Sequence, residues 1–280
     1  MKNKIIMSAF IALFYQASTD AIVIRHDVDD KKYLAKPEDF PPLATLYSIG
    51  VHGTLIAPNW VVTAGHTIFC MEPGDKIKVG EQWAEIEARY THAKFELEEE
   101  NDIALLKLKN PIRNIQPAKL YRGSAENNTN IWFIGRGNTG NGLTGQISEN
   151  IQKNGKLRKA ENKIEKVSER EIYFVFDEGE DALPLEGVSG NADSGGPAYK
   201  LIEDDYYLFG ISSRIDSLVK GVGEYGVDEV YSRVSFHAPW IDKVMSNDRE
   251  YIEKNTTQYH FAQDEIINNL VQVCEMIGFK

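Results

Sequence analysis

The sequence predicts an all-β protein, and three observations support this prediction. Short runs of apolar, β-branched and aromatic residues recur between residues 41 and 234. Gly, Pro and Asn lie between these runs, and no repeat of fixed period is present. Runs of this length and composition are typical of strands, and many short strands joined by turns indicate a β-sandwich or β-barrel.

The expected strands fall into two groups that are separated by residues 110–130, a segment rich in turn-forming residues. In the first group we expect strands at 43–47, 53–56, 60–64 and 103–108. In the second group we expect strands at 131–134, 171–176, 206–211 and 229–234. The segment between them is expected to cross from one half of the protein to the other.

From Pro239 onward the apolar residues recur every three or four positions, which indicates helices. Pro239 suits the first position of a helix. The apolar positions are Trp240, Ile241, Val244 and Met245 in the first helix and Ile266, Leu270, Cys274 and Ile277 in the second. Residues 246–280 are therefore expected to form a helical C-terminal extension that packs on the body of the protein, with a partner-docking helix as the alternative.

The N-terminus has the pattern of a secretory signal. Lys2 and Lys4 precede an apolar run at residues 5–15, which is too short to span a bilayer, and small residues follow it. Cleavage after Ala21 would give a mature chain that starts at Ile22. Residues 1–21 are thus predicted to be a signal peptide and the protein to be secreted or periplasmic. A buried N-terminal helix is the alternative.

Charge and cysteine content limit the possible partners and crosslinks. The 280 residues include 31 basic and 42 acidic side chains, and the net charge of −11 would repel the phosphate backbone of nucleic acids. We therefore expect no nucleic-acid partner, and no membrane association once the signal is removed. Cys70 and Cys274 permit one disulfide that would tie the C-terminal tail to the body, or they remain two unpaired residues.

The sequence also holds the parts needed for nucleophilic hydrolysis: a hydroxyl, a base and a carboxylate that orients the base. His66 follows the apolar segment Trp60-Val61-Val62-Thr63-Ala64-Gly65. Asp102 precedes the apolar segment 103–108, and Ser194 lies in the glycine-rich loop Asn191-Ala192-Asp193-Ser194-Gly195-Gly196-Pro197. His66 and Cys70 alone do not make a metal site, which needs three or four ligands.

These three motifs, in the order His, Asp, Ser, resemble those of the chymotrypsin- and trypsin-like serine proteases. The resemblance covers about residues 22–245. It implies two antiparallel six-stranded β-barrels, at about 22–125 and 126–245, with the active site in the cleft between them. It also implies a monomer that needs no cofactor and acts on polypeptides.

The resemblance assigns a role to each residue of the expected site. Ser194 would attack the scissile carbonyl, His66 would transfer its proton, and Asp102 would hold the His66 imidazole. The backbone amides of Ala192 and Ser194 would form the oxyanion hole. Ala192 stands where the family has glycine, so a positive φ would cost about 1 kcal/mol there.

Two further comparisons with the family concern activation and disulfides. Signal cleavage would expose Ile22, whose amine could pair with Asp193, the residue before the nucleophile, without a separate pro-peptide. The family's usual Gly-Gly after this start is replaced by Ile24-Arg25. Val51 and Thr67 occupy the places of the cysteines that usually bracket the catalytic histidine.

The expected substrate pocket gives two conflicting indications. By position, Val188 would form its floor, and Ser213 and Ile215 would lie on the substrate-binding strand. Ile215 in place of glycine would favour small aliphatic side chains. Glu229 on the pocket wall would instead need a cation, supplied by a basic substrate or by Arg214.

The sequence therefore predicts a secreted serine endopeptidase. A protease-shaped binding protein without turnover is the first alternative. An esterase of the α/β-hydrolase type, using Ser194 with Asp205 and His237, is the second. It would need a Gly-x-Ser-x-Gly motif that Ala192 interrupts.

Overall fold

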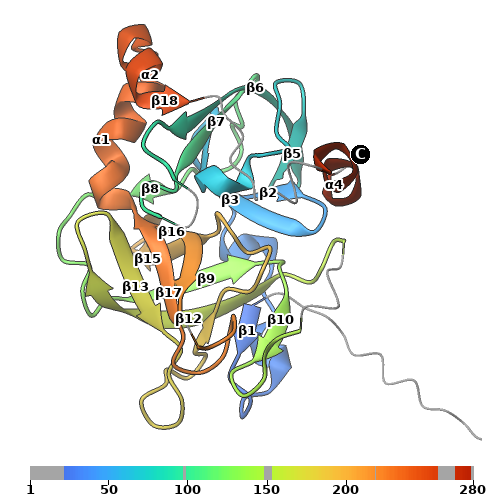
Figure 1. The fold of residues 1–280 in the computed structure, drawn as a ribbon, viewed down its shortest axis with the longest axis vertical. Coiled ribbons are helices and arrows are strands. Elements are labelled where there is room, and N and C mark those ends of the chain that lie inside the picture. Colours follow the sequence, from blue (N-terminus) through green and yellow to red (C-terminus); the bar gives the residue numbers. More distant parts are fainter. Residues whose placement is uncertain (1–21, 97–98, 148–152, 218, 258–268, 279–280) are drawn as a thin grey trace, which may run out of the picture.

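A computed structural model describes residues 22–96, 99–147, 153–217, 219–257 and 269–278. The predicted signal peptide and Ile266 lie outside these ranges. The described residues form two closed β-barrels, one from the first half of the chain and one from the second (Figure 1). The all-β prediction and the two six-stranded barrels are confirmed.

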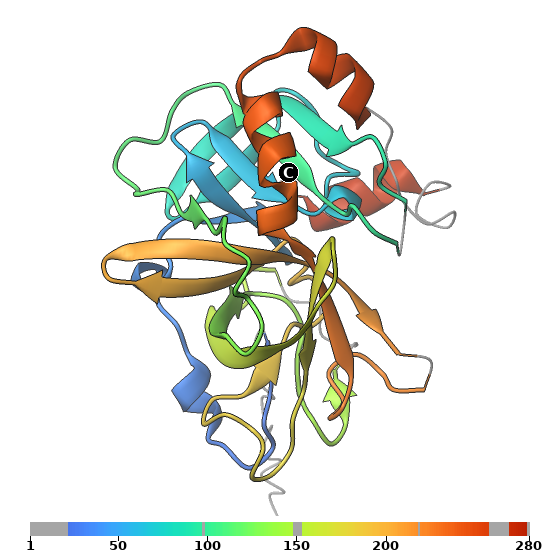
Figure 2. The same ribbon diagram turned by 90° about the vertical axis from the view of Figure 1, so that its left-hand side faces the viewer.

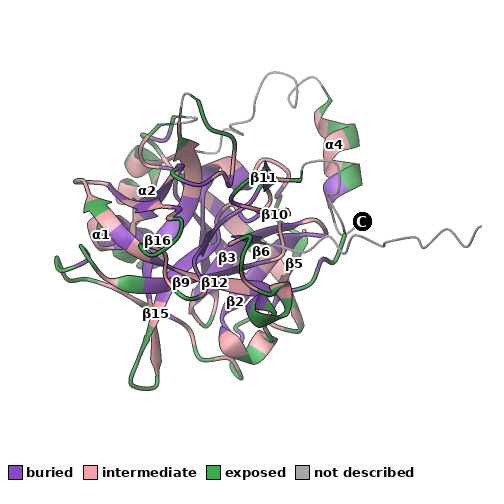
Figure 3. Cartoon of the chain, turned by 90° about the horizontal axis from the view of Figure 1, so that it is seen from below, coloured by how far each residue is buried: buried purple, intermediate pink, exposed green. Residues whose placement is uncertain are grey.

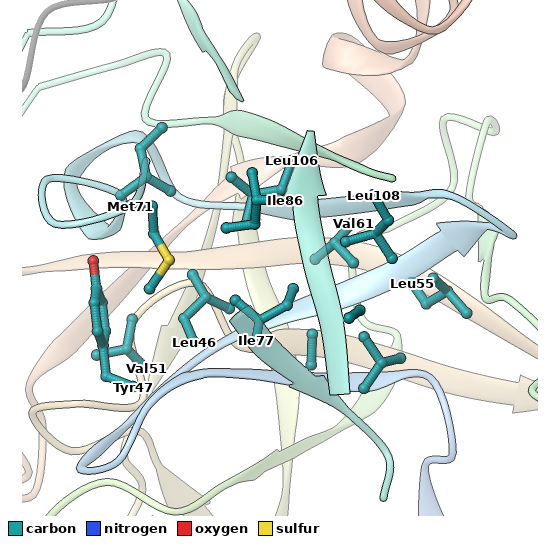
Figure 4. Close-up of a cluster of buried hydrophobic side chains, with 14 of the residues drawn as sticks. Leu46, Tyr47, Val51, Leu55, Val61, Met71, Ile77, Ile86, Leu106 and Leu108 are labelled. Carbon is teal, nitrogen blue, oxygen red and sulfur yellow. The ribbon is translucent and has the colours of Figure 1, made fainter. Parts of the chain in front are cut away.

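The first barrel closes in the hydrogen-bonded order β6-β5-β2-β3-β4-β7, with β6 pairing to β7. Its strands are β2 (Leu43–Tyr47), β3 (Gly50–Ala57), β4 (Trp60–Thr63), β5 (Lys76–Val79), β6 (Gln82–His92) and β7 (Ala104–Leu108). Leu46, Leu55, Val61, Ile77 and Leu106 are among the side chains that fill it (Figure 4). The short strand β18 (Thr256–Thr257) extends this sheet beside β6.

The second barrel closes in the order β15-β9-β12-β13-β17-β16, with β15 pairing to β16. Its strands are β9 (Asn130–Gly135), β12 (Arg158–Val167), β13 (Glu171–Val175), β15 (Pro197–Ile202), β16 (Asp205–Asp216) and β17 (Asp228–Arg233). The rings of Phe133, Phe174 and Tyr231 pack against one another in its core. The strand β8 (Lys119–Leu120) is added in parallel to β16.

A smaller four-stranded sheet holds the start of the described chain. It consists of β1 (Ile22–Ile24), β10 (Thr139–Asn141), β11 (Gly145–Gln146) and β14 (Gly187–Val188). β1 pairs with β10 and β14, so residues 22–24 lie with the second barrel. The predicted boundaries had placed them in the first barrel, which is wrong. The reason is apolar packing, because Val23 is buried in a cluster with Phe176 and Val188.

The described helices are short: the 3-10 helices lie in the first half of the chain and the α-helices in its C-terminal part. They are η1 (Asp30–Tyr33), η2 (Pro37–Asp39), η3 (Gly65–Thr67), α1 (Val234–Met245), α2 (Arg249–Asn255) and α4 (Leu270–Ile277). The prediction that Pro239 begins a helix is wrong, because α1 starts at Val234 and contains Pro239. α1 buries an apolar face that includes Val234 and Ile241 in a cluster with residues of both barrels, and Figure 2 shows it alongside them.

The C-terminal helix α4 is fastened to the first barrel. A disulfide joins Cys70 to Cys274, and Ile277 is buried in the core of that barrel. The carbonyl of Ile277 accepts hydrogen bonds from the amide and the hydroxyl of Ser48. The other faces of α4 are largely exposed (Figure 3). Among the described helices, none has the length and apolar character needed to cross a membrane.

Candidate active site

The three residues singled out in the sequence come from three separate segments. His66 lies in the short helix η3, directly after β4, and Asp102 lies two residues before β7. Both therefore belong to the first barrel, where β4 and β7 are hydrogen-bonded neighbours. Ser194 lies in the loop between β14 and β15 of the second half. The site is thus built where the two barrels meet.

His66 and Asp102 are joined by two hydrogen bonds. The backbone amide of His66 donates to Asp102 Oδ1 at 2.9 Å, and His66 Nδ1 lies 2.7 Å from Asp102 Oδ2. Ser213 Oγ also donates to Oδ2 at 2.6 Å, and Ser232 Oγ donates to the Asp102 carbonyl at 2.7 Å. An acceptor-only carboxylate at Nδ1 fixes the tautomer that leaves His66 Nε2 free to accept a proton.

Burial and charge act in opposite directions on this pair. Burial acts to raise the pKa of Asp102, but the neighbouring His66 and the hydrogen bonds to the carboxylate bring it below its ordinary value. Burial acts to lower the pKa of His66, but the charge of Asp102 and the hydrogen bond to it raise it above its ordinary value. Asp102 therefore stays charged and makes His66 a stronger base.

The Ser194 loop packs directly on the segment that carries His66. The amide of His52 donates to the Ser194 carbonyl at 2.8 Å, and the amide of Gly195 donates to Ser212 at 2.9 Å. Gly195 has φ of +73°, and a Cβ there would lie 2.2 Å from Thr63 Oγ1. Only glycine fits this contact, so the loop can approach the end of β4 as closely as it does.

Ser194 and the proposed oxyanion donors are free in the described part of the chain. There, Ser194 Oγ makes no hydrogen bond to His66 or to any other residue, and the amides of Ala192 and Ser194 have no acceptor. Ala192 has φ of +68°, as its replacement of glycine predicts. Its methyl group packs against the core of the first barrel, and this contact offsets part of the cost of the left-handed conformation.

Asp193 is buried among backbone amides. Gly137 and Gly190 donate to its two oxygens at 2.7 and 3.0 Å, and Ile22 N donates to Oδ2 at 3.3 Å. The predicted neighbours Ile22 and Asp193 are thus together. Burial raises the pKa of Asp193 to about 6, although these amides act to lower it. His52 Nε2 lies 3.7 Å away, and burial lowers the pKa of His52 to about 3, so this ring is neutral.

Beside Ser194 lies a cavity of about 110 Å³. Its walls come from the nucleophile loop and from β16 and β17, and the residues that line it include Ser189, Asn191, Ser194, Ser213, Ile215 and Glu229. Ser213, Ile215 and Glu229, which the sequence predicted in the substrate pocket, thus line one cavity. Because Ser213 also contacts Asp102, the cavity adjoins the His66–Asp102 pair.

The expectation for Val188 is wrong, and so is one of the two alternatives for the cation beside Glu229. Val188 does not form its floor, because it pairs with Val23 and is buried in the apolar cluster behind it; Ser189 faces the cavity instead. Arg214 does not neutralise Glu229, because its guanidinium lies 2.6 Å from the buried carboxylate of Glu171. The sequence placed Arg214 near the pocket but could not show which of two carboxylates it reaches.

The esterase alternative is also wrong. Asp205 lies on the β15–β16 hairpin and pairs with Lys119, whereas His237 is buried in α1 and neither of its ring nitrogens has a hydrogen-bond partner. Asp205 and His237 therefore do not form a pair that could act as a base for Ser194. In the described ranges no three His, Cys, Asp or Glu residues are grouped so that they could hold a metal ion.

Some residues that support the site were not singled out from the sequence. His52 Nε2 accepts a hydrogen bond from the Arg136 amide at 2.8 Å. This ring thus joins strand β3 to the loop after β9, whose Gly137 amide binds Asp193. Ser189 bonds Glu229, and Ser232 holds the Asp102 carbonyl. Position relative to Ser194 could have identified Ser189. Nothing in the sequence marks His52, because its role depends on strands that are distant in the chain.

A comparison with known families agrees with this geometry. The sequence model of the Trypsin family matches residues 32–241, which is more than half of the chain. The chain therefore belongs to the trypsin family of serine proteases, and its two β-barrels are the chymotrypsin-like fold. The match supports a serine-type peptidase, a hydrolase that acts on polypeptides.

Proposed function

We propose that this protein is a secreted or periplasmic endopeptidase that cleaves peptide bonds with Ser194, His66 and Asp102. The observation that carries the proposal is the half-buried His66–Asp102 pair, which lies against the loop that presents Ser194. The orientation of His66 leaves Nε2 as the proton acceptor, and Ser194 Oγ has no competing partner in the described residues. Hydrogen bonds between catalytic groups often form only when substrate is bound.

In the proposed reaction, Ser194 Oγ attacks the scissile carbonyl while His66 Nε2 takes its proton. The carbonyl oxygen becomes an oxyanion and receives hydrogen bonds from the amides of Ala192 and Ser194. His66 then gives the proton to the leaving amine, and an acyl-enzyme remains. In the second half water attacks the ester carbonyl while His66 Nε2 takes its proton. The bond from the acyl group to Ser194 Oγ then breaks, His66 returns the proton to Ser194 Oγ, and the carboxylic acid product leaves. Asp102 stabilises the charged imidazole in both halves.

Maturation is proposed to occur by signal cleavage after Ala21. In the uncut chain Ile22 has φ of +66°, a strained value for a β-branched residue. This torsion requires a preceding carbonyl carbon, so cleavage before Ile22 would abolish it together with its cost. The new amine would lie beside the buried carboxylate of Asp193 and supply the positive charge that its amide partners lack. Sequencing of the secreted protein should give Ile22-Val23 as its N-terminus; any other start contradicts this step.

A fluorophosphonate probe tests the nucleophile. The mature wild type is expected to become covalently labelled at Ser194, and Ser194→Ala should lose all labelling. Ser189→Ala is the matched control, because it removes a nearby hydroxyl that bonds Glu229 and has no imidazole beside it. If the folded wild type resists the probe, the protein is a protease-shaped binding protein.

A further inference from the structure

The C-terminal helix α4 is fastened to the first barrel at two segments, and one of them carries His66. The disulfide of Cys274 reaches Cys70, which lies four residues after His66. Near the end of the helix, the Ile277 carbonyl accepts hydrogen bonds from the amide and the hydroxyl of Ser48, at 3.0 and 2.9 Å. Ser48 directly follows strand β2. α4 therefore bridges the end of β2 and the segment that follows His66.

A buried phenol links the same two segments from inside the barrel. Tyr47, the last residue of β2, is 1% exposed, and its Oη donates to the Thr67 carbonyl at 2.7 Å. The same oxygen accepts a hydrogen bond from the Cys70 amide at 3.2 Å. Tyr47 lies at one end of the barrel core (Figure 4). α4 on the outside and Tyr47 on the inside thus hold one segment in parallel.

The turn that contains His66 receives this support directly. The amide and the hydroxyl of Thr67 both donate to the Ala64 carbonyl, at 3.3 and 2.7 Å, and so close the short helix η3 around His66. Only three residues separate His66 from Cys70. A displacement of Cys70 would therefore move this turn, and with it the imidazole that pairs with Asp102.

Without the disulfide, α4 would be held weakly. Among the eight residues of α4, all of which the structure describes, only Ile277 is buried, whereas Val271 and Met276 are 70% and 62% exposed. Cavities of about 450 and 300 Å³ adjoin the helix, and both are lined by the disulfide. A helix of this length is not stable in water by itself. Its position therefore depends on the bond between Cys70 and Cys274.

The disulfide is open to chemical reduction, because both of its cysteines are only half-buried. One thiolate of a dithiol would attack a sulfur of the pair, so that the bond between Cys70 and Cys274 breaks as a mixed disulfide forms. The second thiolate of the dithiol would then displace the protein sulfur from the mixed disulfide. The dithiol leaves as a cyclic disulfide, and Cys70 and Cys274 take up its two electrons and two protons as thiols.

We propose that α4 and the Cys70–Cys274 disulfide form a clamp that positions the His66 turn, and that reduction of this disulfide by a dithiol lowers the rate of the proposed hydrolysis. The inference rests on the proposed function, because it assigns a control of that same site. Cys70, Cys274 and Tyr47 are positioning residues, since they act through the segment that carries His66. Tyr47 keeps its hydrogen bond to this segment when the disulfide is reduced, so activity decreases without being abolished.

The first test compares the mature protein before and after reduction with dithiothreitol, using a peptide p-nitroanilide that the oxidised protein cleaves. We expect kcat to fall about 10–10²-fold, because a shift of about 1 Å in a catalytic group has an effect of this size. KM should change little, since the cavity beside Ser194 is lined by the nucleophile loop, β16, β17 and Val222, and not by α4. Reoxidation should restore kcat.

Two results of this test would overturn the proposal. Equal kcat for the oxidised and the reduced protein would show that the His66 turn does not need the clamp. Unfolding of the first barrel on reduction, followed by circular dichroism, would show that the disulfide holds the whole barrel and not the His66 turn.

Cys70→Ser/Cys274→Ser is the matched control for the reductant, because the chain contains no other cysteine. The double variant should have the low kcat of the reduced wild type, both with and without dithiothreitol. A kcat equal to that of the oxidised wild type would overturn the proposal. A further loss when dithiothreitol is added would do so too, because the reductant would then act elsewhere.

Tyr47→Phe tests the parallel link while leaving the disulfide intact. We expect kcat to fall about 2-fold in the oxidised protein and about 10-fold in the reduced protein, because each link compensates for loss of the other. Tyr33→Phe is the matched control: this phenol is buried in the second barrel, donates to the Glu186 carbonyl at 3.0 Å and accepts from the Arg25 amide at 3.4 Å. It should change neither value. Equal factors for Tyr47→Phe in the two redox states would contradict the parallel arrangement and overturn the clamp.

A measurement on Ser194→Ala separates this inference from the proposed hydrolysis. The pKa of the His66 imidazole is followed by NMR in the oxidised and the reduced protein. We expect reduction to lower this pKa toward its ordinary value, because Asp102 raises it through a contact that the clamp maintains. Such a shift supports the clamp even if the fluorophosphonate probe fails and the protein does not turn over. An unchanged pKa of His66 overturns it, even if the probe labels Ser194.

Discussion

Asp102 and Asp193 are both almost fully buried, yet they have opposite electrostatic environments. Asp102, at the first barrel, faces the imidazole of His66 and the hydroxyl of Ser213, and its pKa is lowered. Asp193, in the second half, faces backbone amides and a neutral His52, and its pKa is raised to about 6. In the described residues no Lys or Arg pairs with Asp193.

This difference in environment distinguishes two parts of the site. Folding alone completes the His66–Asp102 pair, whereas the Ser194 loop with Asp193 is proposed to be completed by cleavage before Ile22. The His66–Asp102 pair has all its partners in the chain that still carries residues 1–21. Asp193 precedes Ser194 in its loop and has no Lys or Arg counterion among the described residues; under the proposed cleavage, the amine of Ile22 would supply one. The His66–Asp102 pair is therefore preformed, whereas the proposed oxyanion stabilisation is expected to depend on the new N-terminus.

The largest effect on activity should come from a change in the His66–Asp102 pair. Asp102→Asn is expected to lower kcat about 10⁴-fold, because an amide in place of the carboxylate favours the wrong tautomer of His66. The acid limb of the kcat/KM profile should also move to lower pH, because the charge that raises the pKa of His66 is gone. Steady-state kinetics of the mature protein measure both effects.

Asp205→Asn is the control for this change, because it removes a carboxylate from a distant surface hairpin where it pairs with Lys119. It should leave both kcat and the acid limb in place. A loss of less than tenfold in Asp102→Asn would mean that His66 is not oriented by Asp102.

The second-largest effect on activity should come from loss of the pairing between the Ile22 amine and Asp193. A protein that starts at Ala21 differs from the mature one by one residue and cannot place its amine beside Asp193. Its kcat/KM should be lower by about 10²–10³-fold, the cost of losing an oxyanion-hole donor. In the chain that starts at Ile22, Asp193→Asn should lower kcat/KM by the same factor.

Purified proteins of both lengths, each verified by mass spectrometry, provide the comparison. The His66–Asp102 pair should be unaffected, so the acid limb of their pH profiles should coincide. Equal kcat/KM for the two starts would show that the Ser194 loop is ordered without the amine.

Much of this architecture could be predicted from local sequence. The strands β2, β4, β7 and β13 are mainly apolar, and their predicted positions agree with the structure to within one residue at each end. Strands β6 and β12 were not predicted because polar residues occupy some of their buried positions, as Arg158 and Asn162 do in β12.

The site was predictable to the extent that it depends on motifs. His66, Asp102 and Ser194 lie in short segments of distinctive sequence, and the structure brings those segments together. The partner of Arg214 was not predictable, because the choice between Glu171 and Glu229 is made by pairing among β13, β16 and β17. Val188 was misplaced for a related reason: adjacent residues of a strand face opposite sides, so one position decides between core and cavity.

The opposite pKa shifts also predict different effects of pH on stability. An unfolded Asp releases its proton near pH 3.9, whereas Asp193 in the folded uncut chain holds it to about pH 6. Between these values the folded state binds more protons, so rising pH favours unfolding by up to about 3 kcal/mol in total. For Asp102 the sign is reversed: its stabilisation is present above the unfolded pKa and is lost as pH falls through the folded value.

Thermal unfolding of Ser194→Ala between pH 4 and 7 tests this contrast without self-digestion. In the uncut chain, stability should decline over this range relative to the same chain with Asp193→Asn. In the chain that starts at Ile22, the positively charged amine should remove most of that decline. Identical pH dependence of the two lengths would mean that Asp193 gains no counterion on processing.

The smallest effect concerns Ala192, where the two barrels touch through a strained residue. Ala192→Gly removes a left-handed alanine, worth about 1–2 kcal/mol, but also removes a methyl group that packs on the first core, worth about 0.8 kcal/mol. We expect a net stabilisation of less than about 1 kcal/mol, measured by denaturant unfolding. Ala198→Gly is the matched control, because Ala198 lies buried in β15 without a positive φ and should be destabilised instead. If Ala192→Gly is destabilised as much as Ala198→Gly, the methyl contact outweighs the strain, and alanine is kept here to hold the Ser194 loop against the first barrel.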